Sequence, residues 1–481
     1  MCEARGEIPL GILFEQKEVS VKKSASRVLI VMALAMIASS AFAAVTPSGL
    51  ISDNAVLQQG IKLPIWGTAD VGEKVTVTLQ GQTVSTTAKN GWWMLWLNPL
   101  KAGGPFTMKI NDLEIKNLLV GEVWVCSGQS NMAWQVKSAE NSEKVIADSK
   151  DPMLRLFLVP KMRWPQVLPT AWQECSPESA PTFSAVGYFF GKHLRESLNV
   201  PVGLIDSSIG GTPADAWTSR SALLSNAALK EIVETPWTRP SYLYNSMIAP
   251  LVPYGIRGAI WYQGESNARR AYQYRELLSA MIKNWRDAWG EPDLAFLIVQ
   301  LAPFGREDPK RPDPSWAELR ESQVQVTQTV PKTGIAVITD IGEQLNIHPV
   351  KKDPVGARLA LAARAIAYGE KNLIYSGPIY KSSAIEDGKV IVSFDHVGSG
   401  LMAKDGDLTG FTVCGEDRNF VPAQAKIEGN TVVVWSADVP KPVAARYGWS
   451  NWMVVNLFNK EDLPASPFRT DDFPLTTLLA P

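Results

Sequence analysis

Apolar and polar residues alternate in short runs over residues 44–118, most clearly in EKVTVTLQG and WWMLWL. Alternation with a period of two predicts strands that bury one face, and the Gly, Asn and Asp residues between the runs are typical of turns. We therefore expect a small sandwich-like β domain at residues 44–118.

The pattern changes over residues 119–375, where continuous apolar runs alternate with segments of helical period such as ARRAYQYRELLSAMIKNWRDAWG. Strands without polar positions, separated by helices, indicate a parallel sheet that is covered on both faces. We therefore predict an α/β fold with a flavodoxin-like domain at 119–375, built on a five-stranded parallel sheet. The expected strands are EVWVCS, VGLIDSS, RGAIWYQ, LAFLIVQL and GIAVITD.

Residues 376–481 return to the alternating pattern, in runs such as KVIVSFDH and NTVVVWS. This pattern predicts a C-terminal β region. Its strands could form a sandwich of their own or pair with the N-terminal β region, and the pattern leaves both arrangements open.

The first 43 residues read as a targeting segment. Basic residues precede an apolar run at 28–37, and small residues ending in Ala43 follow, which is the order of a cleaved secretory signal peptide. The apolar run is too short to span a membrane. Because such signals are usually only ~15–30 residues long, the residues before the basic cluster read as an extension from an upstream start. We predict a secreted or periplasmic protein that has no membrane attachment after cleavage.

The charges of the chain are balanced, with 47 basic and 48 acidic residues, so no basic face predicts a nucleic-acid partner. Three cysteines remain after signal cleavage, and an odd number allows at most one disulfide within the chain. The cysteines and histidines show no metal-binding spacing, so we expect neither a metal nor a cofactor. The three cysteines are Cys126, Cys175 and Cys414.

Four of the predicted strands end in polar loops: SGQSNM, SSIGGTPADAW, QGESNA and DIGEQLNIHP. Ligands bind at the carboxyl ends of the strands in an open parallel sheet, so these loops should meet at one edge. They bring together a serine, a Gly-Gly pair, amide side chains and a histidine. Ester hydrolysis needs a serine that a base deprotonates and N–H donors for the oxyanion. The loops therefore predict a serine hydrolase.

The chain has three histidines, and one of them lies in such a loop. His193 lies within a predicted helix and His396 in the C-terminal β region, whereas His348 follows a core strand, so we expect His348 to be the base. Two serines compete for the role of nucleophile. Ser130 in GQSNM and Ser266 in GESNA stand at similar strand-to-helix turns, and the turns alone do not separate them.

The blocks GEVWVCSGQSNM, SSIGGTPADAW, AIWYQGESNA and NIHPVKKDPVGARLA resemble successive blocks of the SGNH hydrolases. More narrowly, they resemble the sialate O-acetylesterases and related bacterial carbohydrate acetylesterases, over nearly the whole mature chain. The resemblance implies a serine esterase that removes O-acetyl groups from carbohydrates, with 9-O-acetyl sialic acid as the first expectation. Acetylated xylan or xyloglucan is the alternative substrate, and a non-catalytic, secreted glycan-binding protein is the alternative of another class. The arginines near the loops that could hold a sialate carboxylate are Arg269, Arg270 and Arg306.

The same resemblance implies roles for the site residues. Ser130 would be the nucleophile and His348 the base, which leaves Ser266 as a structural residue. The oxyanion would receive backbone N–H groups and one side-chain amide from the loop WYQGESN. The implied donors are the N–H groups of Ser130 and of Gly210 or Gly211, together with the amide of either Gln263 or Asn267.

The histidine segment departs from the wider superfamily, which places an acid three residues before the histidine. Leu345 occupies that position here, and Asn346 follows it. An asparagine can hydrogen-bond an imidazole but cannot offset its positive charge. We expect Asp340, at the end of the last strand, or Glu343 to orient the ring, with a Ser–His dyad supported by a backbone carbonyl as the alternative.

Overall fold

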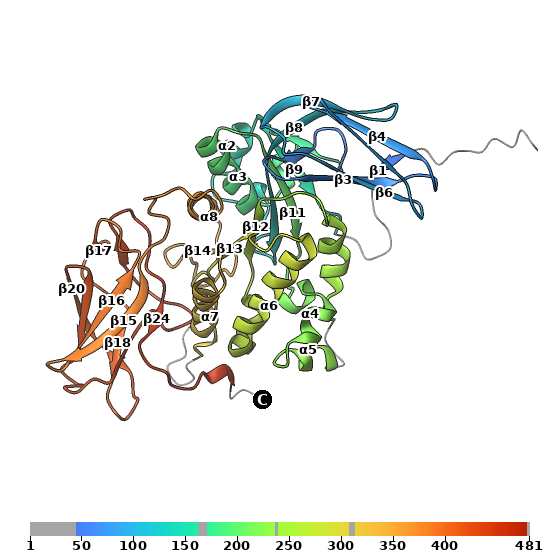
Figure 1. Ribbon diagram of the computed structural model, residues 1–481. Coiled ribbons are helices and arrows are strands. Elements are labelled where there is room, and N and C mark those ends of the chain that lie inside the picture. The colour runs from blue at the N-terminus through green and yellow to red at the C-terminus, as the bar shows by residue number, and fades with distance from the viewer. Residues whose placement is uncertain (1–44, 162–170, 236–238, 307–312, 479–481) are drawn as a thin grey trace, which may run out of the picture.

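A computed structural model describes residues 45–161, 171–235, 239–306 and 313–478 (Figure 1). The predicted targeting segment at 1–43 lies outside the described residues. Among the described residues, no helix combines the length and the apolar character needed to cross a membrane. All three described cysteines are buried and free, so the disulfide that the sequence allowed is not formed.

Six parallel strands form the centre of the molecule, flanked by helices. The five strands predicted from the sequence are all present, in the flavodoxin-like spatial order 2-1-3-4-5. The predicted number of strands was too low. One further parallel strand extends the sheet, and an antiparallel strand pairs with it at the edge. In spatial order the strands are β10 (Gln173–Cys175), β9 (Asp151–Leu158), β11 (Val202–Ser208), β8 (Leu113–Gly128), β12 (Gly258–Tyr262), β13 (Ala295–Val299) and β14 (Thr333–Ala336).

Helices cover the sheet, and the longest of them lie in packed pairs (Figure 1). The helices α3 (Ala185–Leu198) and α8 (Asp353–Ile366) pack against each other, as do α6 (Ala271–Trp289) and α7 (Ser315–Thr329). Gly356 permits the close approach of α8 to α3, because a Cβ atom there would lie 2.5 Å from the backbone nitrogen of Phe190. The shorter helices are α2 (Ser142–Ala147), α4 (Arg220–Ser225) and α5 (Lys230–Glu234).

The N-terminal β region is continuous with the central sheet through β8, which has 16 residues. The first half of β8 pairs with N-terminal strands, and its second half pairs with β11 and β12. The boundary expected at residues 118 and 119 therefore falls inside a single strand. The strands joined to β8 on this side are β2 (Val56–Gln58), β7 (Gly103–Ile110), β4 (Lys74–Leu79) and β5 (Gln82–Thr87), and a second sheet holds β1 (Thr46–Pro47), β3 (Leu63–Thr68) and β6 (Trp92–Leu97).

The C-terminal strands pair with one another and enclose their own apolar core, so within the described residues they do not join the N-terminal sheets. Arg320 of α7 anchors this region, because its buried guanidinium donates to the carbonyl oxygens of Ser450 (2.8 Å) and Asn451 (3.0 Å). One sheet contains β15 (Ile379–Glu386), β16 (Lys389–Asp395), β21 (Thr431–Trp435) and β20 (Gln424–Glu428). The others contain β19 (Val421–Pro422), β18 (Phe411–Cys414), β22 (Ala444–Tyr447) and β24 (Phe468–Arg469), and the pair β17 (Leu401–Ala403) and β23 (Leu457–Asn459).

Candidate active site

Three of the predicted loops lie side by side, because β11, β8 and β12 are adjacent and end at the same level. Gly128 at the end of β8 is in register with Ser208 of β11 and with Tyr262 of β12. The Gly128 position requires glycine, since its φ is +136° and a Cβ atom would lie 2.1 Å from the carbonyl oxygen of Tyr262. This close approach sets the spacing between the loop SGQSNM and the loop QGESNA.

Ser130 is half-buried in the turn that follows β8, and the Gly-Gly pair of the second loop lies against it. A Cβ atom built on Gly210 would be 3.3 Å from the Ser130 Cβ atom and 3.9 Å from the Ser130 backbone nitrogen. Gly211 has a φ of +71° and open space beside it. The structure thus brings Ser130 and Gly210 together, as expected from the sequence.

The amides of Gln263 and Asn267 are arranged in series. The Gln263 Nε2 atom donates to Asn267 Oδ1 (2.7 Å) and to the carbonyl oxygen of Thr212 (3.1 Å), and Gln263 is fully buried. The Asn267 Oδ1 atom also accepts from the backbone N–H of Ala214 (2.9 Å). Its Nδ2 atom has no hydrogen-bond partner in the part of the chain that the structure describes. The arrangement therefore leaves the Asn267 N–H group, and not that of Gln263, available to a ligand.

The phrases GQSN and GESN hydrogen-bond to each other. The Gln129 Oε1 atom accepts from the Ser266 backbone N–H (3.2 Å) and from Gln263 Nε2 (3.2 Å), and Asn131 Nδ2 donates to Glu265 Oε1 (2.6 Å). Ser266 is exposed and contributes its backbone to this link. Similar sequences thus fold into two loops that hold each other in place.

His348 lies in the segment after β14, and the Ser130 loop contacts this segment at two points. The Asn131 Nδ2 atom donates to the carbonyl oxygen of Ile347 (3.0 Å), and the Trp134 ring stacks on the His348 ring with their centroids 5.1 Å apart. Burial, and after it the positive charge of Lys352, lower the pKa of the His348 imidazole below its ordinary value. A neutral imidazole can accept a proton, which is the form that a general base requires.

The two acids expected to orient His348 have other partners. Both carboxylate oxygens of Asp340 accept hydrogen bonds from Arg358, at 2.6 and 2.7 Å. Glu343 accepts from the backbone N–H of Val350 (2.9 Å) and from Asn346 Nδ2 (3.1 Å), so it organises its own loop. Arg358 on α8 thus binds both oxygens of Asp340, and no hydrogen bond joins either acid to the imidazole within the described residues, so the orienting acid stays a prediction.

The other histidines lie elsewhere. His193 on α3 is hydrogen-bonded to Asp353 (2.6 Å), and His396 lies beside Tyr375 in the C-terminal region. No group of three His, Cys, Asp or Glu side chains within the described residues could hold a metal ion.

Sequence reasoning missed Asn131, Glu265 and Lys352, which form a polar cluster that joins the loops SGQSNM and QGESNA to the segment of His348. The Asn131 Oδ1 atom accepts from Lys352 Nζ (2.6 Å), while Asn131 Nδ2 donates to Glu265. The repetition of GQSN in GESN was a signal for the first two residues. No comparable signal marked Lys352, because Lys351 precedes it and only the fold distinguishes the buried lysine from the exposed one.

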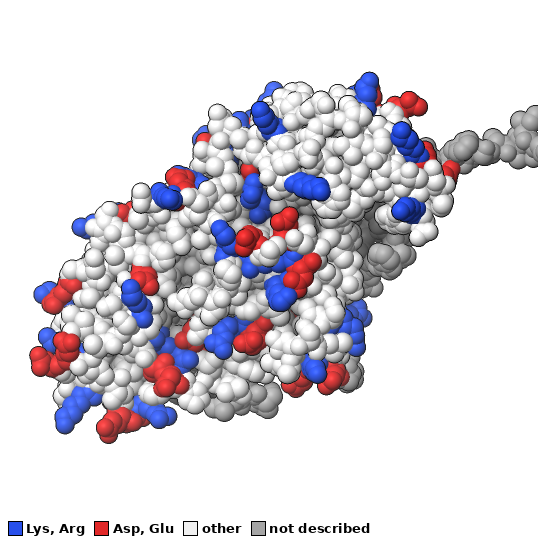
Figure 2. Space-filling view, in the orientation of Figure 1, with Lys and Arg blue, Asp and Glu red and all other residues white. Residues whose placement is uncertain are grey.

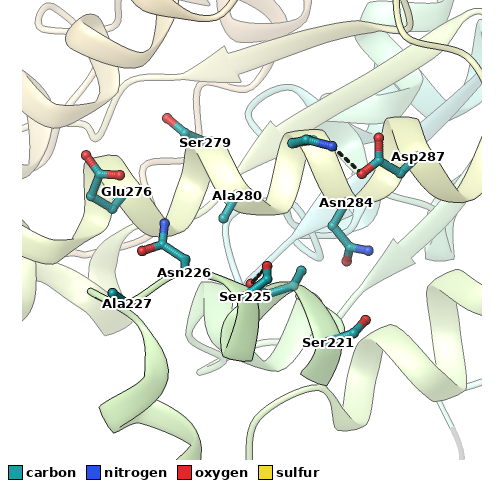
Figure 3. A pocket seen from close by; sticks show the side chains of 11 residues that line it. Ser221, Ser225, Asn226, Ala227, Glu276, Ser279, Ala280, Asn284 and Asp287 are labelled. Carbon is teal, nitrogen blue, oxygen red and sulfur yellow. Dashed lines mark hydrogen bonds and ion pairs between the residues drawn. The ribbon is translucent and has the colours of Figure 1, made fainter.

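A separate hollow of about 770 Å³ lies between α4 and α6, away from these loops (Figure 3). Its lining includes Ser221, Asn226 and Glu276, together with Lys283 and Asp287, which form an ion pair at 2.6 Å. None of the predicted site residues lines this hollow. On the face of the molecule shown in Figure 2, acidic and basic side chains are intermixed, as expected from the balanced charge.

Comparison with known proteins identifies the family. Residues 120–363 match the model of the carbohydrate esterases described as sialic acid-specific acetylesterases. The human sialate O-acetylesterase is 32% identical over 84% of this chain and 88% of its own length, and the mouse enzyme is 30% identical over 84% and 90%. The crystal structure of a carbohydrate acetylesterase from Xanthomonas citri superposes with a TM-score of 0.83 at 41% identity, over 89% of this chain and 100% of that one. The chain therefore belongs to the sialic acid-specific acetylesterase family of carbohydrate esterases, and it is a carboxylic ester hydrolase.

Proposed function

We propose that this enzyme removes O-acetyl groups from sialic acid through an acetyl-enzyme on Ser130, with His348 as the base. The observation that carries the proposal is the position of Ser130, which lies against Gly210 in a loop that is hydrogen-bonded and stacked to the segment of His348. The family supports the removal of acetyl groups from carbohydrates, and its curated members that match this chain are sialate O-acetylesterases.

The reaction proceeds in two steps. His348 takes the proton of the Ser130 hydroxyl while the Ser130 oxygen bonds to the acetyl carbon. The protonated imidazole then gives that proton to the sugar oxygen as the bond between this oxygen and the acetyl carbon breaks. Water, deprotonated by His348, attacks the acetyl-enzyme, the bond to Ser130 breaks as the imidazolium returns the proton to the serine oxygen, and acetate leaves. The oxyanion of each step accepts from the backbone N–H groups of Ser130 and Gly210 and from Asn267 Nδ2.

A Ser–His dyad is the form of the mechanism that the described contacts favour. Asp340 and Glu343 are engaged with Arg358 and with the loop backbone, and no acid among the described residues is hydrogen-bonded to the imidazole. The stacking of Trp134 on His348 provides an alternative means of fixing the orientation of the ring.

Arg269 is our candidate for holding the sialate carboxylate. It stands two residues after Asn267 and is exposed, and it makes no ion pair within the described residues. Its neighbour Arg270 is already paired with the buried carboxylate of Asp215 (2.9 Å), so that charge is compensated. An arginine presents a planar pair of donors that matches a carboxylate.

Acetate release from three substrates tests the proposal: 9-O-acetyl sialic acid, acetylated xylan and acetylated xyloglucan. We expect Ser130→Ala to lower turnover of the preferred substrate by several orders of magnitude while Ser266→Ala stays close to wild type. Activity in Ser130→Ala with a loss in Ser266→Ala would reverse the assignment of the nucleophile. Arg269→Gln should raise KM for 9-O-acetyl sialic acid and leave p-nitrophenyl acetate unaffected. A preference for the plant polysaccharides would refute the sialate assignment and retain the esterase.

We also propose that the protein is exported, on the basis of the basic, apolar and small-residue segments that end at Ala43. Sequencing the N-terminus of protein recovered outside the cytoplasm should give Ala44 as the first residue. Recovery of the full-length chain from the cytoplasm alone would contradict this proposal.

A further inference from the structure

A buried polar cluster joins the three loops of the site. Lys352 and Asn131 are each 1% exposed, and the Oε2 atom of Glu265 is buried without a hydrogen-bond partner in the described part of the chain. Asn131 stands at the centre, because its oxygen accepts from the Lys352 ammonium and its nitrogen donates to Glu265 and to the Ile347 carbonyl. The cluster therefore links residues that lie one or two positions from Ser130, Asn267 and His348 in the sequence.

The aromatic side chains around Lys352 favour its charged form. Its Nζ atom lies 5.3 Å from the ring centroid of Tyr262 and 5.9 Å from that of Trp134. Ring faces attract cations, and this attraction is larger in a desolvated site. Trp134 also stacks on His348, so one indole is near both the ammonium group and the imidazole ring.

We propose that Lys352 is a positioning residue of the esterase site: it holds Asn131 in the orientation that joins the loops, and its buried ammonium group, next to the Trp134 ring that stacks on His348, opposes a second positive charge on that imidazole. The inference rests on the proposed role of His348. It differs from the mechanism of a Ser–His–Asp triad, where an acid beside the histidine stabilises the imidazolium.

The charges around His348 support this assignment. Burial lowers the pKa of Lys352 to about 7, against the opposing effect of Glu265 and Glu343. Lys352 is thus mostly protonated over the more acidic range in which His348 titrates, and there its charge disfavours the imidazolium. The ionisable groups of the histidine segment are Glu343, the exposed Lys351 and the buried Lys352. Those packed around it are Glu265 of the helical turn η6 (Glu265–Arg270) and the exposed Glu140, whose backbone N–H donates to the Val350 carbonyl oxygen.

Lys351 is exposed, so the buried cation among these groups is Lys352. Its removal should therefore raise the pKa of His348, whereas loss of any of the acids would have the opposite sign. A raised pKa protonates His348 at a higher pH, so the acidic limb of kcat/KM should move to higher pH. A residue with a purely structural role would lower the plateau without moving the limb.

The test measures Lys352→Met and Lys352→Gln beside the matched control Lys351→Met, which removes the exposed neighbouring charge. NMR titration of the imidazole C–H signals reads His348 directly, because the chain has three histidines and His348→Gln identifies the signal. We expect the pKa of His348 and the acidic limb of kcat/KM to rise together by roughly 0.5–1 unit in the Lys352 variants, as for the loss of one charge in a partly solvated site. The remote His396 and the control variant should not change.

A folded Lys352 variant in which the His348 titration stays in place, or moves downward, overturns the inference. Should neither variant fold, the wild-type titration decides: a His348 pKa below the ordinary value of about 6.5 that rises with added salt supports the inference, because salt screens a charge but does not change burial. A pKa at or above that value, or one that salt leaves unchanged, overturns it. The NMR readout needs no turnover, so it is independent of the proposed function. Full activity of Ser130→Ala would refute that function and leave the titration result standing.

Discussion

Replacement of Asn267 tests whether this residue is the proposed oxyanion donor or only a structural amide. The two roles can be told apart because the two ends of the side chain have different partners. The Oδ1 atom accepts from Ala214 N–H (2.9 Å) and from Gln263 Nε2 (2.7 Å), which fixes the orientation of the amide. The Nδ2 atom is the end without a partner in the described residues. Asn267→Ala removes both ends, whereas Asn267→Asp keeps the acceptor and replaces the donor by an oxygen.

The size of each effect follows from these contacts. Loss of one oxyanion donor lowers kcat by about 10²–10³, which corresponds to about 2.7–4 kcal/mol. Loss of the acceptor leaves the buried N–H of Ala214 unsatisfied, which costs roughly 1–3 kcal/mol of folding stability, whereas Gln263 Nε2 keeps Thr212 and Gln129 as acceptors. We therefore expect both variants to lose at least about 10² in kcat, whereas Asn267→Ala alone should lose stability through its missing acceptor.

The assay combines kcat on p-nitrophenyl acetate with urea unfolding, and Ser266→Ala in the same loop is the control. Near-wild-type kcat in a folded Asn267→Asp variant would refute the assignment, since a carboxylate cannot donate to the oxyanion. A kcat loss confined to Asn267→Ala and proportional to its loss of stability would make the residue structural.

The other predictions concern charge and burial. Asp340→Asn should keep turnover within a few-fold of wild type and lower the melting temperature, because Arg358 loses two charged hydrogen bonds; loss of turnover at unchanged stability would restore Asp340 as the orienting acid. Burial raises the pKa of Asp206 from 3.8 to about 6, so the folded state retains a proton that the unfolded state releases, and stability falls as pH rises between these values. Asp206→Asn should therefore raise the unfolding free energy by about 1–3 kcal/mol at pH 8 and by little near pH 4, and equal effects in urea unfolding at both pH values would contradict this. The three described cysteines are free and buried, so a thiol reagent should label none in the native protein and all three after denaturation, and rapid native labelling would show that a thiol is accessible.

The central strands could be predicted because a buried parallel strand can be recognised from a short stretch of sequence, as an unbroken apolar run between turn residues. The strand β9 was not predicted, because its sequence DPMLRLFL contains a charged residue at its centre and so is not an unbroken apolar run. Arg155 is nevertheless buried there, and its guanidinium donates to the Pro152 carbonyl (2.8 Å) and forms an ion pair with Glu174 (3.2 Å). The partner Glu174 lies beyond an intervening segment, so no local pattern could show that the charge is satisfied.

The same limit applies within the site. Loop placement follows from strand order, which is why Ser130 and Gly210 could be expected together. The partner of Asp340 depends on the turn of α8 that presents Arg358, 18 residues further along the chain. The choice between Gln263 and Asn267 depends on which amide the surrounding carbonyl groups already occupy. These are questions of three-dimensional hydrogen-bond satisfaction, and residue type does not answer them.

The two asparagines of the repeated phrase show how one residue type performs opposite tasks. Asn131 has both ends satisfied inside the protein, because Lys352 can only donate and the carboxylate of Glu265 is an acceptor. An aspartate at 131 would place a second carboxylate against Glu265, and an alanine would leave two buried charges without their partner. Asn267 instead has its oxygen held by two donors, and its nitrogen has no partner among the described residues. The repeated phrase therefore supplies one amide that fixes the loops, and we propose that the other donates to the charge that develops on the acetyl group.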